Sequence, residues 1–198
     1  MLFNLTENNS LNDTYKLMSQ TIIPRPIAWV VTEDKGIVNI APFSYFIGLS
    51  SNPASVLISV GHKNDGTPKD TLANIRNYKK CTICMVQEDD LVKMHLSSKG
   101  LEHEESESEV FDIETVREDE NFPPRIMSAP VAYYCTLNQE INLGESSTIP
   151  LVLNVEKIFV DDEVITDKEK LSISFKPVAR IGKNYAFLGE DVNAPKIP

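Results

Sequence analysis

The sequence predicts a mainly β protein, a β-barrel of antiparallel strands with a few helices. Short apolar runs rich in β-branched residues outnumber the segments with helical spacing. These runs are separated by turn signals, without the regular strand–helix alternation of a parallel α/β fold. The 198 residues, 41% hydrophobic and 24% charged, suffice for a buried core. We therefore expect a single domain over residues 1–198, with no repeat or linker dividing it.

The first predicted strands form a hairpin. Residues 26–32 are apolar, and they stop at the turn signal of residues 33–36, EDKG. Residues 37–46 follow directly and predict the partner strand. Pro42 lies inside this second run and lacks a ladder donor, which predicts an edge or bulged strand. Further strands are predicted at residues 55–61, 81–87, 131–143 and 149–160.

The clearest helix start lies at residues 67–70, TPKD. This tetrapeptide supplies a hydroxyl N-cap, a proline at the first helical position and a carboxylate at the third. Leu72, Ile75 and Tyr78 then recur at threefold spacing, which predicts one buried face. A second, short helix is predicted over residues 89–97.

The net charge of −10 is concentrated in one segment. Residues 102–120 contain ten acidic side chains and one basic one, Arg117. Such a run is typical of a solvated surface segment, and a docking face for a basic partner is the alternative. The acidity argues against nucleic acid as a partner. The nearly neutral residues 1–100 are the better place for an anionic ligand such as a phosphate.

The sequence also predicts the compartment. The longest apolar stretches are too short to span a bilayer, and the first residues lack the basic and apolar regions of a signal peptide. The three cysteines, an odd number, fit a reducing environment better than a disulfide framework. We expect a soluble, cytoplasmic protein without a membrane partner.

Several common motifs are missing from the sequence. No glycine pattern matches a Rossmann or P-loop nucleotide site, and no G-x-S-x-G elbow is present. The three histidines, His62, His95 and His103, lack metal-ligand spacing, so no metal site is expected. Cys81 and Cys84 match C-x-x-C, the pattern of a redox pair or half a zinc site. In a strand, however, positions three apart face opposite sides, which favours a structural role.

Residues 21–53 carry an unusual number of polar side chains within apolar strands. Asparagine, threonine, serine and arginine side chains there surround Trp29, the only tryptophan. Each is an ordinary strand or turn residue when taken alone; together they resemble a surface for a flat heterocycle with a polyol and phosphate tail. The start of the helix at Lys69, Asp70 and Thr71 could hold a phosphate through free N–H groups, or be a plain capped helix.

Three segments carry a resemblance to a known family. The runs PRPIAWVVTEDKGIVNIAPFSYF, KDTLANI and PVARIGKNYA occur in this order within about residues 20–189. They resemble the flavin reductase-like proteins with an FMN-binding split barrel. The resemblance implies an antiparallel split β-barrel and a homodimer with FMN near the subunit interface. It also implies chemistry that moves hydride or electrons through the flavin ring.

The resemblance implies that no side chain is catalytic, because FMN carries the chemistry. Lys69 would stabilise negative charge on reduced FMN. Arg180 and Tyr185 match the last segment, which implies a structural or interface role for them. Arg25 fits the first segment, where it would either contact FMN or brace the barrel. The cofactor-binding residues that it implies are Trp29, Val30, Thr32, Asn39, Ile40, Ala41, Ser44, Ser50, Lys69, Asp70 and Thr71.

The function expected from the resemblance is that of an NAD(P)H-dependent FMN (flavin) reductase. It would pass electrons through FMN to free flavin, ferric iron or a partner protein. One alternative is an FMN-binding electron carrier or storage protein without its own NAD(P)H activity, and another is an interaction protein that uses residues 102–120. The sequence shows no basic patch for a 2′-phosphate, and the acidic segment would repel the phosphates of NADPH.

Overall fold

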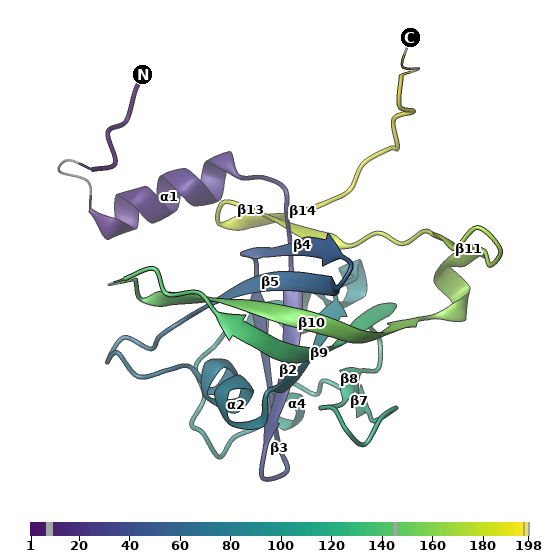
Figure 1. The fold of residues 1–198 in the computed structure, drawn as a ribbon, viewed down its shortest axis with the longest axis horizontal. Helices are drawn as coiled ribbons and strands as arrows, with labels where there is room; N and C mark the ends of the chain where they lie inside the picture. Colours follow the sequence, from purple (N-terminus) through teal and green to yellow (C-terminus); the bar gives the residue numbers. More distant parts are fainter. Residues whose placement is uncertain (7–9, 145, 196, 198) are drawn as a thin grey trace.

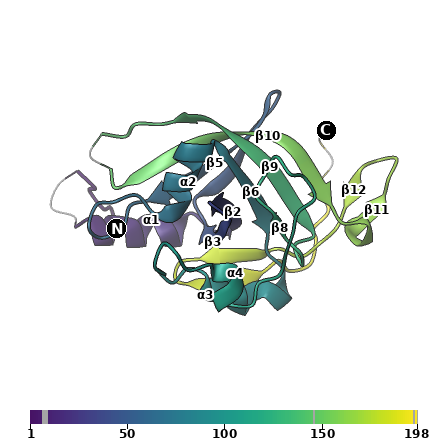
Figure 2. The ribbon, with the colours of Figure 1, turned by 90° about the horizontal axis from the view of Figure 1, so that it is seen from below.

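The computed structural model describes residues 1–6, 10–144, 146–195 and 197. Its main feature is an antiparallel sheet of seven strands in the order β3-β2-β6-β9-β10-β5-β4. The strands curve around a common interior (Figures 1 and 2). The bounds of these strands are β2 Ala28–Asp34, β3 Ile37–Phe43, β4 Phe46–Ser51, β5 Ala54–Gly61, β6 Lys80–Met85, β9 Val131–Glu140 and β10 Thr148–Val160.

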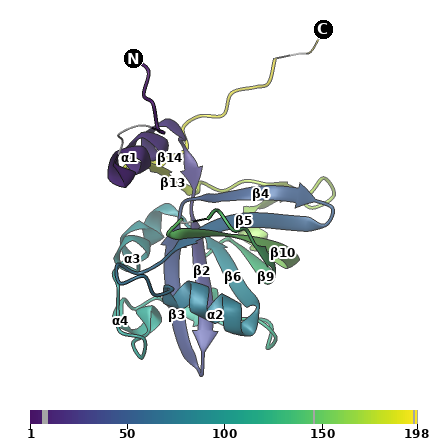
Figure 3. The same ribbon diagram turned by 60° about the vertical axis from the view of Figure 1, so that its left-hand side comes forward.

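Smaller elements surround the barrel. A three-stranded sheet, β1-β13-β14, lies beside α1 at the end of the molecule where both termini emerge (Figures 1 and 3). The remaining strands are β1 Arg25–Pro26, β7 Thr115–Val116, β8 Arg125–Ile126, β11 Ile165–Asp167, β12 Ser172–Ile173, β13 Val178–Ile181 and β14 Asn184–Phe187. The helices are α1 Leu11–Thr21, α2 Asp70–Tyr78, α3 Leu91–Leu96 and α4 Glu107–Val110, with 3-10 turns at Glu88–Asp90 and Asp162–Val164.

Strand β2 is buried on both faces, which explains its nearly continuous apolar run. Ala28 and Val30 belong to the cluster inside the barrel, where Leu72 and Ile75 of α2 complete the packing. Trp29 belongs to a second cluster on the outer face of the sheet. The side chains of β2 therefore pack into the interior cluster on one face and into the outer cluster on the other.

The outer cluster is covered by later parts of the chain. Met94 of α3, Ile113 and Ile126 pack there against the β2–β6–β9 face. Helices α3 and α4 lie beside β3 (Figure 3). Among the described helices, none is both long and apolar enough to cross a membrane.

The predicted hairpin is confirmed, with one change. Strands β2 and β3 pair from Asp34 and Ile37 outward, and the two turn residues Lys35 and Gly36 have φ of 49° and 86°. Positive φ at both positions is typical of the tight turn that matches strand twist. Pro42 lies on β3, an edge strand, as predicted. The run predicted as one strand over residues 37–46 ends at Phe43, and the chain then enters β4.

The main helix begins later than predicted. Helix α2 starts at Asp70, with Lys69 as its N-cap and no capping bond from a side chain. Thr67 does not cap it, because the Thr67 hydroxyl and N–H both donate to the carboxylate of Asp65, at 2.6 and 2.9 Å. Pro68 forms an isolated bridge with His62. The hydrogen bonds of Thr67 thus stay within the loop before α2, and the prediction of a Thr67 cap is wrong.

The other predicted elements differ from the structure mainly in length. Strand β6 ends at Met85, β9 ends at Glu140, and residues 88–96 form a 3-10 turn followed by α3. Cys81 lies in the interior cluster and Cys84 in the outer one, as the strand assignment predicted. The two thiols of the C-x-x-C pattern therefore face opposite sides of the sheet.

Candidate functional site

A groove of about 610 Å³ opens at the start of α2. Its walls come from β3, from the loop after β5, from the first residues of α2 and from the segment after α3. We call it the α2 groove, and its volume lies in the range of roughly 300–1,000 Å³ typical of small-molecule sites. It is lined by Asn39, Ala41, His62, Lys63, Asn64, Asp65, Lys69, Asp70, Thr71, Ser97, Ser98, Lys99, Gly100, Leu101, Glu102 and Glu107.

The structure brings five of the predicted cofactor-binding residues together in this groove. They come from two segments far apart in sequence: Asn39 and Ala41 from β3, and Lys69, Asp70 and Thr71 from the start of α2. Local sequence alone does not place these segments side by side. The sheet order does so, because α2 packs across both β2 and β3.

A buried polar network fixes the floor of the α2 groove. The amide of Asn39 donates to the hydroxyls of Thr32 and Thr71, at 3.1 and 3.0 Å. The amide of Asn74 donates to the same Thr32 hydroxyl at 3.1 Å. These bonds join β2, β3 and α2 in a setting where unpaired polar groups are costly. The side chains that face the groove are therefore held in one arrangement.

The start of α2 is suited to an anion. Lys69 and Lys99 line the groove, and no carboxylate pairs with either of them in the described part of the chain. The first turn of α2 has no capping side chain, so its N–H groups and the positive end of its dipole are open. Lys63 forms an ion pair with Asp70 at 3.0 Å and is less available.

Four predicted residues lie beneath the groove rather than on its surface. Trp29, Val30, Thr32 and Ile40 are all 0% exposed. Trp29 supports the groove indirectly, because its indole N–H donates to the hydroxyl of Ser97 at 2.9 Å. Their side chains brace the site, and a direct side-chain contact with a ligand is not available to them in this structure.

Two other predicted residues lie elsewhere. The Ser44 hydroxyl accepts from the Nε of Arg25 at 3.4 Å and lines a neighbouring cleft. Ser50 lies on the exposed strand β4 opposite Ser55. At about 3.3 Å per residue, β5 and the residue after it span about 23 Å between Ser55 and the groove residue His62. Within one chain the structure does not bring Ser50 to the groove.

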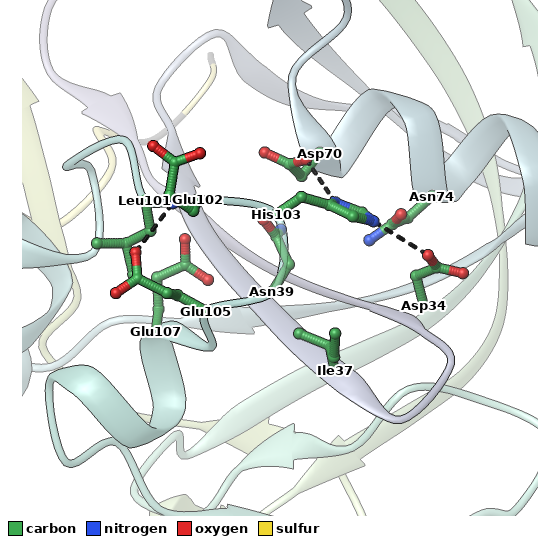
Figure 4. A pocket seen from close by; sticks show the side chains of 10 residues that line it. All are labelled: Asp34, Ile37, Asn39, Asp70, Asn74, Leu101, Glu102, His103, Glu105 and Glu107. Carbon is green, nitrogen blue, oxygen red and sulfur yellow. Dashed lines mark hydrogen bonds and ion pairs between the residues drawn. The ribbon is translucent and has the colours of Figure 1, made fainter.

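His103 lines a small pocket beside the start of α2, which shares Asn39 and Asp70 with the α2 groove (Figure 4). Its Nδ1 lies 2.9 Å from a carboxylate oxygen of Asp70, and its Nε2 lies 3.1 Å from one of Asp34. These hydrogen bonds, with Asp70 first and Asp34 second, raise the pKa of His103 above its usual 6.5. Tyr78 also donates a short hydrogen bond to Asp34 and lowers the pKa of that carboxyl. His103 thus fastens the acidic segment to both β2 and α2.

Part of the acidic segment is folded into the protein. Glu107 is only 6% exposed, and its carboxylate accepts the N–H of Ile40 at 2.9 Å. Burial raises the pKa of Glu107. Ile113 is also buried, in the outer cluster. The expectation of a solvated surface segment is therefore wrong for this portion of residues 102–120.

Two further clefts were missed by sequence reasoning; the first adjoins the α2 groove at Ser98, and the second adjoins the first at Tyr15 and Arg180. The Arg180 cleft, of about 200 Å³, is lined by Tyr15, Ile27, Pro42, Ser44, Met94, His95, Ser98, Arg180 and Tyr185. The α1 cleft, of about 910 Å³, lies between α1 and the β13–β14 hairpin. Arg180 and Tyr185, predicted to have a structural or interface role, line an open cleft. The walls of both clefts combine segments that are far apart in the sequence, so no local pattern predicts them.

Comparison with known proteins agrees with this architecture. Residues 18–176 match the model of the flavin reductase like domain. An uncharacterised protein of Bacillus subtilis is 34% identical over 190 residues, which cover 92% of each chain. The crystal structure of nitrilotriacetate monooxygenase component B from Bacillus cereus is 29% identical, with a TM-score of 0.88 and 98% of each chain covered.

A more distant structure shows the same fold. A split-barrel protein from Shewanella frigidimarina, classed as a flavin reductase, superposes with a TM-score of 0.81 over all of both chains at 18% identity. The antiparallel split barrel predicted from the resemblance is thus confirmed. With the match over residues 18–176, the chain belongs to the flavin reductase-like family.

Proposed function

We propose that this protein is an FMN-dependent oxidoreductase of the flavin reductase type. FMN would bind in the α2 groove, and NAD(P)H would supply the electrons for an acceptor. The observation that carries this proposal is an open helix start and two lysines without a carboxylate partner among the described residues, set above a buried, hydrogen-bonded floor. Membership of the flavin reductase-like family supports it.

The groove fits the chemical parts of FMN. Lys69, Lys99 and the first turn of α2 offer a cation pair and free N–H groups, as a phosphate requires. The hydroxyl of Ser98 is exposed along the wall, where a polyol chain needs hydrogen-bond partners, whereas the Ser97 hydroxyl is buried and already bonded to Trp29 and Met94. In a protein of net charge −10, Lys69 and Lys99, which form no ion pair with any described carboxylate, are the groups of this groove best placed to receive an anion.

Each residue has a binding or positioning part in this proposal. FMN, when bound, supplies the hydride and electron transfer. Lys69 holds positive charge at the groove, where it stabilises negative charge on the ligand. Asn39 and Thr71 keep the floor rigid, and His103 with Asp70 keeps the acidic segment at one side.

A second copy of the chain is the proposed partner. Strand β4 is an edge strand, and it exposes Ile47 and Leu49 as well as Ser50. An exposed apolar edge strand is a surface that proteins usually cover. A homodimer would cover it, and it is the arrangement in which Ser50 of one chain could approach the groove of the other. Light scattering on the purified protein tests this: a monomer that still binds FMN tightly would contradict the dimer.

The proposed electron acceptors follow from the reactivity of reduced FMN and from what a similar protein is named for. Free flavin, ferric iron and a partner protein can all accept electrons from reduced FMN. The Bacillus cereus relative is a component of a monooxygenase, which favours a partner oxygenase among these acceptors.

A visible absorption spectrum tests the proposed function. The purified protein is mixed with FMN, freed of excess flavin, and titrated with NADH and then NADPH without oxygen. A bound-flavin spectrum that bleaches is the expected result. A flavin spectrum that persists would replace the reductase with the electron carrier, and a protein that retains no FMN would overturn the proposal.

A further inference from the structure

Two of the five arginines have no carboxylate partner within the described residues. Arg76, Arg117 and Arg125 each form an ion pair with a glutamate, at 2.7, 2.5 and 2.8 Å. Arg25 and Arg180 form none among residues 1–6, 10–144, 146–195 and 197. In a chain with 29 acidic residues, two arginines without a described carboxylate partner need a physical explanation.

The two unpaired arginines lie directly opposite each other on β1 and β13. Arg25 is 4% exposed and donates to the carbonyl oxygen of Ile22 at 2.7 Å. The Nε of Arg180 donates to the carbonyl oxygen of Gly182 at 3.1 Å, and its guanidinium lies 4.6 Å from the ring centre of Tyr185. Neutral groups thus orient both guanidiniums and leave their charges uncompensated, which favours an anion nearby.

Arg180 lines two clefts that adjoin the α2 groove one after the other, and we call the two clefts together the track. The α2 groove and the Arg180 cleft share Ser98, and the Arg180 cleft and the α1 cleft share Tyr15 and Arg180. Lys16 and Lys183 line the α1 cleft, together with amide side chains. No aspartate or glutamate is among the described residues that line either cleft.

We propose that this track binds the reducing dinucleotide, with Arg180 on its diphosphate and Lys183 on a 2′-phosphate, so that NADPH is preferred over NADH. The inference rests on the proposed function, because a dinucleotide is needed only if the α2 groove holds the flavin that it reduces. Lys16 is a weaker contributor, since it already pairs with Asp13 at 3.2 Å on the surface.

The shape and the charge favour a dinucleotide over a small aromatic acid. The Arg180 cleft alone, of about 200 Å³ with aromatic walls, could take a ring bearing one carboxylate. Lys183, which has no carboxylate partner among the described residues, lines the cleft of about 910 Å³, whose other lining side chains are largely polar. Two cationic positions along joined clefts match a ligand with two separate anionic groups. The acidic segment does not oppose this, because it lines the α2 groove and neither cleft.

Fragments without a nicotinamide ring test the site directly. Isothermal titration calorimetry would measure the binding of adenosine 2′,5′-bisphosphate and of ADP to the FMN-supplemented protein. The wild type should bind the bisphosphate, and Lys183→Gln should weaken this binding about tenfold while leaving ADP unchanged. Arg180→Gln should weaken ADP about tenfold. Lys170→Gln and Arg76→Gln, which change the same residue types outside the track, should bind both fragments as the wild type does.

Other outcomes would overturn the inference. It fails if the Lys183→Gln variant binds the bisphosphate like the wild type, since Lys183 is exposed and its loss cannot unfold the protein. It also fails if benzoate binds in an Arg180-dependent way while neither nucleotide binds, which would assign the cleft to an aromatic acid. FMN affinity is measured on every variant. Normal FMN binding with no nucleotide binding refutes this inference alone, whereas no FMN binding by the wild type refutes the proposed function.

Discussion

The carboxylate of Glu107 on α4 accepts the backbone N–H of Ile40 on β3 at 2.9 Å. Ile40 belongs to an edge strand, so this N–H has no strand partner on that side. A glutamate side chain thus replaces a missing strand, next to Asn39 and Ala41 of the α2 groove. The bond couples the acidic segment to the site, and its energetics can be measured.

Glutamine and alanine at position 107 should differ in stability. Burial raises the pKa of Glu107 above its usual 4.5, so its contribution to stability falls as the pH rises from 4.5 through the raised pKa. Glu107→Gln keeps an acceptor for Ile40 and should remove this fall. Glu107→Ala leaves the N–H unpaired and should cost about 1–3 kcal/mol relative to glutamine. Urea unfolding between pH 4 and 8 measures both, and equal stability of the two variants would contradict the role of the bond.

The attachment of the acidic segment should depend on pH. Because the bonds to Asp70 and Asp34 raise the pKa of His103, the stabilisation is complete below pH 6.5 and is lost as the pH rises through the raised pKa. We expect amides of residues 100–105 to lose hydrogen-exchange protection at pH 9 relative to pH 6, after correction for intrinsic rates. The His103→Gln variant should lack this dependence. If it shows the same change as the wild type, another group fastens the segment.

Lys69 should determine how tightly FMN is held. Its ammonium group lines the groove without a carboxylate partner in the described chain, so its loss removes a charge-assisted contact. We expect Lys69→Ala to weaken FMN binding about tenfold or more, with little change in unfolding. Lys176→Ala, an exposed lysine outside the three clefts, is the matched control. Fluorescence titration of FMN measures both, and equal affinities would remove Lys69 from the site.

Trp29 should report both folding and ligand binding. It is the only tryptophan, it is fully buried, and it is bonded to the groove residue Ser97. We expect blue-shifted emission that acrylamide quenches poorly and that FMN in the nearby groove quenches strongly. Trp29→Phe loses core volume and the bond to Ser97, and should cost about 1–3 kcal/mol. Unquenched emission in the FMN-saturated protein would place the flavin elsewhere.

The cysteines should be inert in the folded protein. Cys81, Cys84 and Cys135 are buried, and burial raises the pKa of Cys84 to about 12. Iodoacetamide should label none of them at pH 8 within minutes in native buffer, and all of them in urea. A disulfide between Cys81 and Cys84, found by mass spectrometry of the native protein, would contradict their separation on opposite faces of β6.

The barrel strands were predictable because local patterns determine them. Alternating or continuous apolar runs and the turn at Lys35 and Gly36 identify β2, β3, β5, β6, β9 and β10 to within a few residues. Helix α1 lacked such a signal, because it exposes apolar residues such as Leu11 and buries only Ser19. The start of α2 was misplaced, since Thr67 hydrogen bonds to Asp65 rather than to the helix. Residue types alone do not show whether the Thr67 hydroxyl will bond to the helix N–H groups or to the Asp65 carboxylate.

The site was predictable in part, and the rest needed tertiary structure. Asn39, Lys69 and Thr71 face the groove as the resemblance implied, although whether they bind FMN stays a prediction. A motif does not say which strand residues face a groove and which face a core, so Val30 and Ile40 proved to be buried. His103, Glu107 and the Arg180 cleft had no local signal, because their partners are distant in sequence.

The pairing of Arg25 with Arg180 has a consequence for biosynthesis. The β1 strand precedes all the barrel strands in the sequence, whereas its partner β13 follows the last of them, β10. Loop closure over such a separation is entropically unfavourable until the intervening barrel has formed. During synthesis on the ribosome, β1 would stay unpaired, and α1 would lack the β13–β14 hairpin beside it, until the barrel strands have been made. Nonsense truncations before β13 would therefore leave the barrel strands present but abolish the Arg180 cleft, which gives late truncation alleles a phenotype distinct from simple loss of folding.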